Sequence, residues 1–463
     1  MLVVRKFLLP VGTLPMLFML FSASGATEVP RPESAWDPLE IELDNSGFLE
    51  SFGFFFNQSP AADGSLEGYI HEAFRRNQML RSRYSDYAAA KEMISQVTSL
   101  PEPRLGYTEY LQPVETRVGP QKRAISLSQS FPWFGSLSLR GDVKKEKAEA
   151  VRSLIYSAAL EIVAEVKKAY YDIGYLEQAI KITEQHVRLR TQWEAVARAR
   201  YSAGSGQYTD VIKAQVEWGI LSDRLAELQD QRRTLAAVMN ALLDRPPVTP
   251  VVVTGRPAAA ELNLDLADLA ARMKARNPLL SAWDHRAREF LFSDRLAGRQ
   301  GYPSFTLGLN YILTGPARMD GVPDSGEDAV MASLAVTLPI WRGKYNSASR
   351  TAVHQYQAAL SSKRELTNNL VASLERSHFR YRGARRKREL YQTALLPKGQ
   401  QSLDATRAAY EAGNSSFLDL VDAERLVLEF ELSLARAQFD VLIQESVLEH
   451  LVAGPLTQFE IKD

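Results

Sequence analysis

The chain has 463 residues, 55 of them basic and 55 acidic, so its formal net charge is zero. This balance gives no indication of a polyelectrolyte partner such as nucleic acid. Cysteine is absent, which excludes disulfides, thiolate metal sites and cysteine nucleophiles. The six histidines include no pair with the i, i+4 spacing of a helical zinc site. With 26 glycines and 22 prolines, the chain has few loop-forming residues for its length, which favours long elements.

A secretory signal is predicted at residues 1–26. Arg5 and Lys6 form a basic start, residues 7–21 an apolar stretch, and Ser24-Gly25-Ala26 a cleavage site of small residues. A membrane anchor is the alternative, but the apolar stretch is too short for one and contains two prolines. No later stretch approaches the roughly 20 apolar residues that a spanning helix needs. Such an exported chain is either soluble outside the cytoplasm or crosses a membrane as β-strands.

Two internal repeats are the most informative pattern in the sequence. Arg76-Asn77 recurs 200 residues later as Arg276-Asn277, and the Tyr-x-Ala-Gly motif at residues 201–204 recurs 209 residues later at 410–413. Prolines separate the two halves and interrupt any helix between them. The predicted divisions are an N-terminal segment at 27–65, a first repeat at 66–244, a linker at 245–261, a second repeat at 262–454 and a C-terminal tail at 455–463.

Each repeat is predicted to contain very long helices. Residues 137–203 contain no proline, and the apolar residues from Ile162 to Ile180 recur in steps of four and three, the pattern of a heptad seam. After a break at Gly204-Ser205-Gly206 the same spacing runs from 211 to 242, and again from 420 to 451. A helix of 67 residues is about 100 Å long, far longer than a compact domain requires. Antiparallel hairpins of such helices form a tube or a stalk.

Strand patterns precede each long helix. Residues 303–313 and 330–338 alternate apolar and small or polar side chains, and 104–111 and 124–131 repeat the pattern more weakly. Each run is about ten residues, the length of a tilted strand that crosses a bilayer. The alternative is a soluble hairpin with one buried face.

A membrane interpretation of the strands requires a homotrimer. Lipid cannot satisfy an open strand edge, and four strands cannot close around a lumen, whereas three chains would supply twelve. The predicted fold class is thus an α+β membrane protein with long helical hairpins and four strands per chain. Trp133 and Trp341 follow their strands and fit an aromatic belt at the membrane interface, or alternatively ordinary packing at a strand-to-helix corner.

These features together resemble the TolC-like outer membrane efflux proteins. The order of helix, strand pair, long helix, Ala-Gly break, Asp six residues later and returning helix occurs twice, over about residues 66–454. The resemblance implies a trimeric channel-tunnel in the outer membrane of a Gram-negative bacterium, with a twelve-stranded barrel in lipid and a helical barrel in the periplasm. It also implies export of small molecules or ions, with a periplasmic adaptor and an inner-membrane pump as partners.

The resemblance further implies roles for residues at the far ends of the hairpins. Four of them occupy the periplasmic tips where an adaptor docks: Gly204, Gly206, Gly413 and Ser415. Four others occupy positions of the polar network and the carboxylates at the periplasmic mouth: Asp210, Tyr410, Asp419 and Asp422. Where the best-known family member has a basic residue two positions after the second tip glycine, this chain has Ser415. The basic residue of the polar network that holds the periplasmic mouth closed is therefore missing, or another part of the chain supplies it.

A helix-start role is the alternative for two of the acidic residues. Asp419 and Asp422 are three apart and share a helix face, so three-fold symmetry would turn them into rings of carboxylates. However, Asp210 and Asp419 each follow a glycine break by six residues, where acidic side chains favour a helix N-terminus.

No motif indicates an enzyme, and we expect no catalytic residue, cofactor or metal. The glycine break is too short for a phosphate loop, and no GxSxG elbow occurs. The basic cluster at 380–388 is assigned to a solvated helix face rather than to an anion site. Two other classes stay open. One is a soluble periplasmic coiled-coil adaptor or scaffold without lipid-facing strands, and the other is an exported enzyme on a helical frame.

Overall fold

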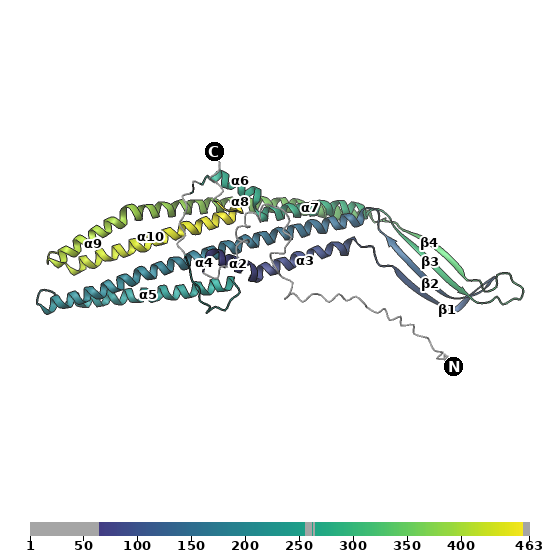
Figure 1. Cartoon of the computed structure of the whole chain (residues 1–463). Helices are drawn as coiled ribbons and strands as arrows, with labels where there is room; N and C mark the ends of the chain where they lie inside the picture. Colours follow the sequence, from purple (N-terminus) through teal and green to yellow (C-terminus); the bar gives the residue numbers. More distant parts are fainter. Residues whose placement is uncertain (1–63, 255–261, 263, 457–463) are drawn as a thin grey trace, which may run out of the picture. The chain divides into compact units, whose positions relative to one another are not determined.

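The computed structural model describes residues 64–254, 262 and 264–456 (Figure 1). The predicted signal and almost all of the N-terminal segment lie outside these residues. The first repeat contains α2 (Leu66–Arg76), α3 (Gln78–Thr98), β1 (Arg104–Thr116), β2 (Gly119–Phe131), α4 (Ser136–Ser202) and α5 (Tyr208–Leu242). The second contains α6 (Leu266–Arg276), α7 (Pro278–Gln300), β3 (Ser304–Thr314), β4 (Ala329–Thr337), α8 (Arg342–Leu390), a π-helical turn (Tyr391–Leu395), α9 (Leu396–Glu411) and α10 (Phe417–Val452).

The order of elements confirms the predicted fold class and the two repeats. The predicted helix at 137–203 is α4, with 67 residues. The four strands form one antiparallel sheet in the order β1-β2-β3-β4. None of the helices in the described ranges is both long and apolar enough to cross a membrane.

Long helices pack side by side in two hairpins. α4 packs against α5, and α9 packs against α10, while α10 also contacts α4 and thus connects the repeats (Figure 1). The predicted heptad seam is buried, since Ile162, Val166 and Ile173 are almost fully covered. At the other end of α4, α3 and α7 pack against it next to the sheet.

The repeated Arg-Asn motif has a structural reason. Asn77 ends α2 and begins α3, where its side chain accepts hydrogen bonds from the first backbone amides of α3. Its amide nitrogen donates to the carbonyl of Leu242 at 2.9 Å, at the end of α5. Asn277 does the same between α6 and α7, and donates to the carbonyl of Leu451 at 3.2 Å. One buried side chain in each repeat therefore caps a helix and fixes the end of the returning helix.

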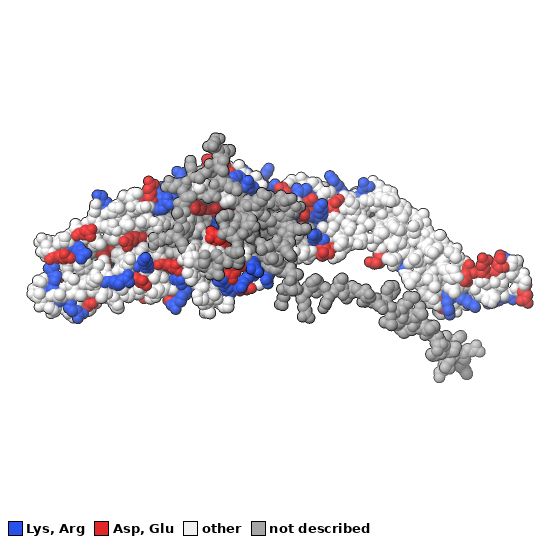
Figure 2. All heavy atoms as spheres, viewed as in Figure 1, with Lys and Arg blue, Asp and Glu red and all other residues white. Residues whose placement is uncertain are grey.

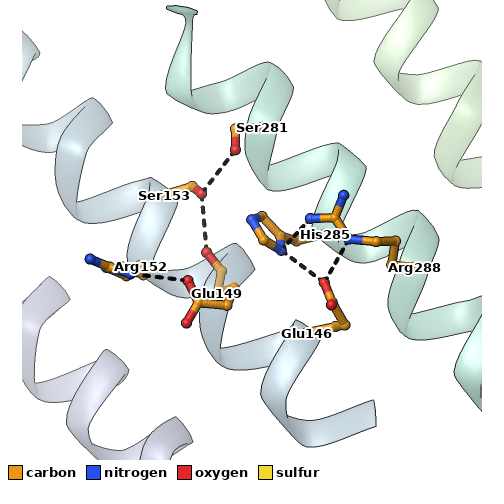
Figure 3. A network of polar contacts seen from close by, with 7 residues as sticks. All are labelled: Glu146, Glu149, Arg152, Ser153, Ser281, His285 and Arg288. Carbon is orange, nitrogen blue, oxygen red and sulfur yellow. Dashed lines mark hydrogen bonds and ion pairs between the residues drawn. The ribbon is translucent and has the colours of Figure 1, made fainter. Parts of the chain in front are cut away.

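A polar network joins α4 to α7 near the sheet (Figure 3). Glu146 of α4 lies 2.8 Å from Nδ1 of His285 and 2.9 Å from Nε of Arg288, both on α7. Burial favours the neutral form of Glu146, but these hydrogen bonds outweigh it and lower its pKa. Two turns further along α4, the Ser153 hydroxyl lies 3.5 Å from that of Ser281. The network keeps the two helices in register where they meet the strands.

The second long helix contains a break that we did not predict. Between α8 and α9 the backbone forms one π-helical turn, followed directly by Pro397 in the first turn of α9. Proline has no amide hydrogen, so it leaves a carbonyl of the preceding turn without its helical partner. A π-turn is a common way to accommodate such a defect without ending the helix.

Candidate functional site

The sheet has one apolar face that is exposed to its surroundings. The strand register places large apolar residues of all four strands together, in rows such as Leu105, Leu127, Leu309, Ala332 and Tyr107, Ile125, Tyr311, Val330. Leu309 is 53% exposed and Leu334 is 65% exposed. In the view of Figure 2 the surface over the strands is largely free of charged side chains, which gather beyond it at the far end of the sheet. A sheet that presents this much apolar surface needs an apolar environment.

The opposite face carries small side chains. Four rows cross it, and their members are Ser130, Thr306, Ala335; Arg104, Ser128, Gly308, Ser333; Gly106, Ser126, Asn310, Met331; and Thr108, Ala124, Ile312, Ala329. A Cβ atom at Gly106 would lie 2.5 Å from the Ser126 hydroxyl, and one at Gly308 would lie 2.5 Å from the Ser333 hydroxyl. We call this surface the small-residue face. Its mostly small and polar side chains are typical of a solvated face of a sheet rather than of a packed core.

The hairpin tips are two copies of the same turn. Gly204 and Gly413 have φ angles of +71° and +81°, in the left-handed region that glycine adopts without strain. In the first turn Ser205 N donates to the Arg200 carbonyl at 2.9 Å, and in the second Asn414 N donates to the Ala409 carbonyl at 2.8 Å. Both are Schellman caps, which satisfy the last carbonyls of α4 and α9.

A small aromatic core joins the tips of the two hairpins. Tyr410 of α9 is buried and packs against Trp193 of α4 and Phe417 of α10, with ring centroids 6.5 and 5.8 Å apart. Arg200 of α4 lies 4.8 Å from the Tyr410 ring and donates a hydrogen bond to its carbonyl oxygen. Burial raises the pKa of the Tyr410 hydroxyl, Arg200 opposes this, and Asp210 adds to it. Asp210 and Tyr410 therefore do lie close together, and Arg200 supplies a basic group that sequence reasoning could not place.

The other predicted tip residues have distinct surroundings. Asp419 forms a capping box with Ser416 at the start of α10, and the Ser415 hydroxyl donates to it at 3.0 Å. Hydrogen bonds from the side chain and backbone of Ser416, and then from Ser415, lower the pKa of Asp419. Asp422 is exposed and lies 3.8 Å from Arg425. Gly206 adjoins Arg200, because a Cβ atom there would lie 2.9 Å from the Arg200 Cβ.

Further along the hairpins, a buried cluster of charged residues connects the repeats. Nδ1 of His186 lies 3.5 Å from Glu424, its Nε2 lies 3.1 Å from Glu431, and Arg190 Nε lies 3.3 Å from Glu424. Glu424 is fully buried, and Arg190 and His186 are nearly so. Burial disfavours the charged imidazole, but the adjacent carboxylates of Glu424 and Glu431 outweigh it and raise the pKa of His186 to about 9.

Sequence reasoning missed this cluster, although a signal exists. The buried residues Ala179, Thr183, His186, Arg190, Trp193 and Ala197 continue the seam of α4 in steps of four and three. Polar residues at seam positions must find partners, because an unpaired buried charge is costly. Within the described residues, no group of three or more metal-ligating side chains could hold a metal ion.

The two tryptophans past the strands differ from one another. Trp133 is half-buried and stacks on Tyr302 and Phe305, with centroids 5.1 and 5.8 Å apart. Trp341 is 77% exposed. Trp133 thus packs at the corner between sheet and helix, while Trp341 is free to face its surroundings.

Comparison with known proteins identifies the family. The model of the outer membrane efflux protein family matches residues 70–243 and 269–454, which is most of the chain. The chain belongs to this family. Among relatives, the cobalt-zinc-cadmium resistance protein CzcC of Cupriavidus metallidurans is 23% identical over 75% of this chain and 81% of that protein. The outer membrane protein OprJ of Pseudomonas aeruginosa is 25% identical over 78% of each chain.

Solved structures share the fold of this efflux protein. The CusC channel superposes with a TM-score of 0.71 at 17% identity, covering 86% of this chain and 96% of the other. The open-state MtrE channel of Neisseria gonorrhoeae gives 0.68 at 18% identity, covering 84% and 89%. The predicted family resemblance is confirmed. The protein is an efflux channel of the Gram-negative outer membrane that extends into the periplasm, which excludes the soluble adaptor alternative.

Proposed function

We propose that three copies of this efflux protein assemble into one export channel, with a barrel of twelve strands in the outer membrane. The exposed apolar face of the sheet carries this proposal. In the described chain β1 and β4 each pair with one neighbour only, so both edges of the sheet are open. Lipid offers no hydrogen bonds to such edges, and closure with further copies satisfies them. Three copies give a barrel within the range of known sizes, with the small-residue face around the lumen.

We assign Trp133 and Trp341 to the membrane interface at the periplasmic end of this barrel. Both follow the last strand residues of their repeats, where aromatic side chains favour the boundary between lipid and water. The exposure of Trp341 supports this role more strongly than the packing of Trp133 does.

We assign docking of a periplasmic adaptor, and through it of an inner-membrane pump, to the two hairpin tips. Gly204 and Gly413, with Gly206 and Ser415 beside them, form turns whose backbone is accessible. No atom lies within 4 Å of a Cβ added at Gly204, and at Gly413 the Arg200 guanidinium is the one neighbour within that distance in the described chain. The predicted repeat boundaries at 66–244 and 262–454 place one tip in each repeat.

We assign the mouth of the channel to Asp210, Tyr410, Asp419 and Asp422. Arg200 takes the part of the missing basic residue in this proposal. It extends from α4 of the first repeat to Tyr410 of the second and thereby holds the two hairpins together. Opening of the mouth would require this contact to break.

The test combines assembly with export. Replacing Gly204 and Gly413 by leucine forces a positive φ angle on a side chain that resists it, at a cost of about 1–2 kcal/mol each. It also places a bulky group on the docking surface. We expect export in cells to be lost while trimers still form in the membrane. Gly219→Leu is the matched control, because Gly219 of α5 is surrounded by open space and has an ordinary φ angle.

Three outcomes would contradict the proposal. Cross-linking of the wild-type protein in native membranes that yields only monomers would overturn the trimer. Loss of trimers in the glycine variants would show that these residues serve folding, and export that continues normally would remove the tips from docking.

A further inference from the structure

Arg104 is the exception on the small-residue face. The register places it opposite Ser128, which pairs with Gly308, and Gly308 pairs with Ser333. In the four rows of that face, from the row of Thr306 to the row of Ile312, Arg104 is the one charged residue. Its neighbours in the row are a glycine and two serines. A long cationic side chain therefore extends from a face that is otherwise uncharged, beside a glycine and two serines.

The other charged residues of the strands lie outside these four rows; they are Glu109, Glu115, Lys122 and Arg123. Glu109 and Arg123 lie on the apolar face and pair with each other at 3.1 Å, towards the far end of the strands. Arg104 is exposed, and in the described part of the chain no ion pair or hydrogen bond holds its guanidinium. Glu102, the nearest acidic residue along the chain, is also exposed and forms no ion pair with it. The charge of Arg104 is thus not neutralised within one copy.

We propose that Arg104 residues of three copies form a ring of positive charge inside the membrane barrel, which binds anionic solutes and favours their passage. This inference rests on the proposed trimer, because symmetry places the three side chains at one level of the lumen. Arginine stays charged at every physiological pH and presents its donors in a planar fork that fits carboxylate and phosphate groups. Rings of basic side chains select anions in pores. The solute class is therefore small molecules that carry carboxylate or phosphate groups.

The cost of placing a charge in lipid supports a side chain of Arg104 that points into the lumen. On the lipid side a cation is destabilising, and increasingly so with depth in the bilayer, whereas on the lumen side it remains in water. The small residues of the row leave the guanidinium free to reach towards the axis.

The experiment uses the absence of cysteine from the chain, which makes any introduced cysteine the only thiol. Asn310→Cys places a thiol in the next row of the small-residue face, and Leu309→Cys places one on the apolar face as the control. Intact cells are treated with two membrane-impermeant methanethiosulfonate reagents, one carrying a sulfonate and the other a trimethylammonium group. The ratio of their reaction rates measures the local potential in the lumen, whatever the state of the periplasmic mouth.

For Asn310→Cys, we expect the ratio of the anionic to the cationic reaction rate to be several-fold higher when Arg104 is present than when it is replaced by glutamine. Arg104→Gln should abolish this preference, and Arg104→Lys should retain it. Inorganic phosphate should slow the anionic reagent only when Arg104 is present. Leu309→Cys should react with neither reagent.

The outcomes separate this inference from the proposed assembly. An unchanged reagent ratio in Arg104→Gln, with trimers intact, would overturn the ring alone. Trimers in which Asn310→Cys reacts with neither reagent would show that this face does not line a lumen, and would also overturn the ring. Wild-type protein that forms no trimer would overturn the assembly itself.

Discussion

The buried cluster around His186 should make the contact between the two repeats depend on alkaline pH. Both nitrogens of the imidazole face carboxylates, and only the doubly protonated ring can donate to Glu424 and Glu431 at once. Arg190 on the same helix also faces Glu424, and Glu217 of α5 lies 3.9 Å from Arg190. Arg425 of α10 pairs with Glu217 in turn. The cluster therefore has equal numbers of positive and negative charges only while His186 is charged.

The size of the effect follows from the pKa of His186. Its rise from 6.5 to about 9 corresponds to about 3 kcal/mol, at about 1.4 kcal/mol for each pH unit. A folded-state pKa above the unfolded value means that this stabilisation is complete below pH 6.5 and is lost as pH rises through about 9. The contact between α4 and α10 should therefore be stable at neutral pH and become less stable at alkaline pH.

Hydrogen exchange along α10 measures this loosening. Protection of residues 417–435, corrected for the intrinsic exchange rate, should fall between neutral pH and pH values well above 9. Glu424→Gln should lower protection by about 3–5 kcal/mol already at neutral pH, because it leaves Arg190 and His186 buried with fewer partners. It should also reduce the pH dependence, because Glu431 then remains the one carboxylate beside His186 that raises its pKa.

Glu429→Gln is the matched control on the same helix. Glu429 pairs with Arg224 at an exposed site, so its replacement should cost at most about 1 kcal/mol and leave the pH dependence intact. Protection that does not change with pH in the wild type would refute the reasoning. So would Glu424→Gln with a wild-type pH profile, since His186 would then not owe its charge to Glu424.

Two further predictions concern acidic groups. Asp422→Asn should shift the ion selectivity of the channel towards anions in bilayer recordings without loss of stability, because it removes negative charge from the mouth. Asp419→Asn should also weaken the start of α10, because it removes the capping box with Ser416. Unchanged selectivity in both variants would place these residues outside the mouth. Burial and the charge of Glu449 raise the pKa of Glu445 to about 7, so stability should fall as pH rises from 4.5 through 7. Glu445→Gln should gain about 1–2 kcal/mol in thermal or denaturant unfolding above pH 7 and nothing at pH 4, and equal stability at both would refute this.

The helices were predictable because each heptad pattern extends over many residues. A run of 67 residues without proline is about 18 helical turns, and its apolar seam in steps of four and three fits no other regular structure. α4 begins and ends within one residue of the prediction. The strands were predictable in position because alternation marks them, and the repeats indicated that both halves contain a pair. Their pairing across repeats, β2 with β3, is a tertiary property that alternation alone does not define.

The unpredicted features depend on contacts between distant residues. The π-turn before Pro397 had a local signal, the proline itself, but a proline alone does not distinguish a kink from a π-turn. The helices on both sides of the turn pack against α10, a contact that the local sequence does not reveal. Arg200 and Tyr410 are 210 residues apart, and each lies in an ordinary helical pattern. The same holds for His186 and Glu431, which are 245 residues apart.

The two repeats share one architecture but differ at their tips, and the difference is chemical. In the second repeat Ser416 caps α10 and engages the carboxylate of Asp419, while in the first Gln207 begins α5 without a side-chain cap. Asp210 is consequently not held by a capping box, and its charge acts on Tyr410 of the other repeat. The first tip thus contributes two charged residues, Arg200 and Asp210, that interact with the second tip. The second tip contributes the buried ring of Tyr410 with which they interact. The contact between the two hairpins therefore depends on side chains that differ between the two copies, although the turns that carry them have the same backbone conformation.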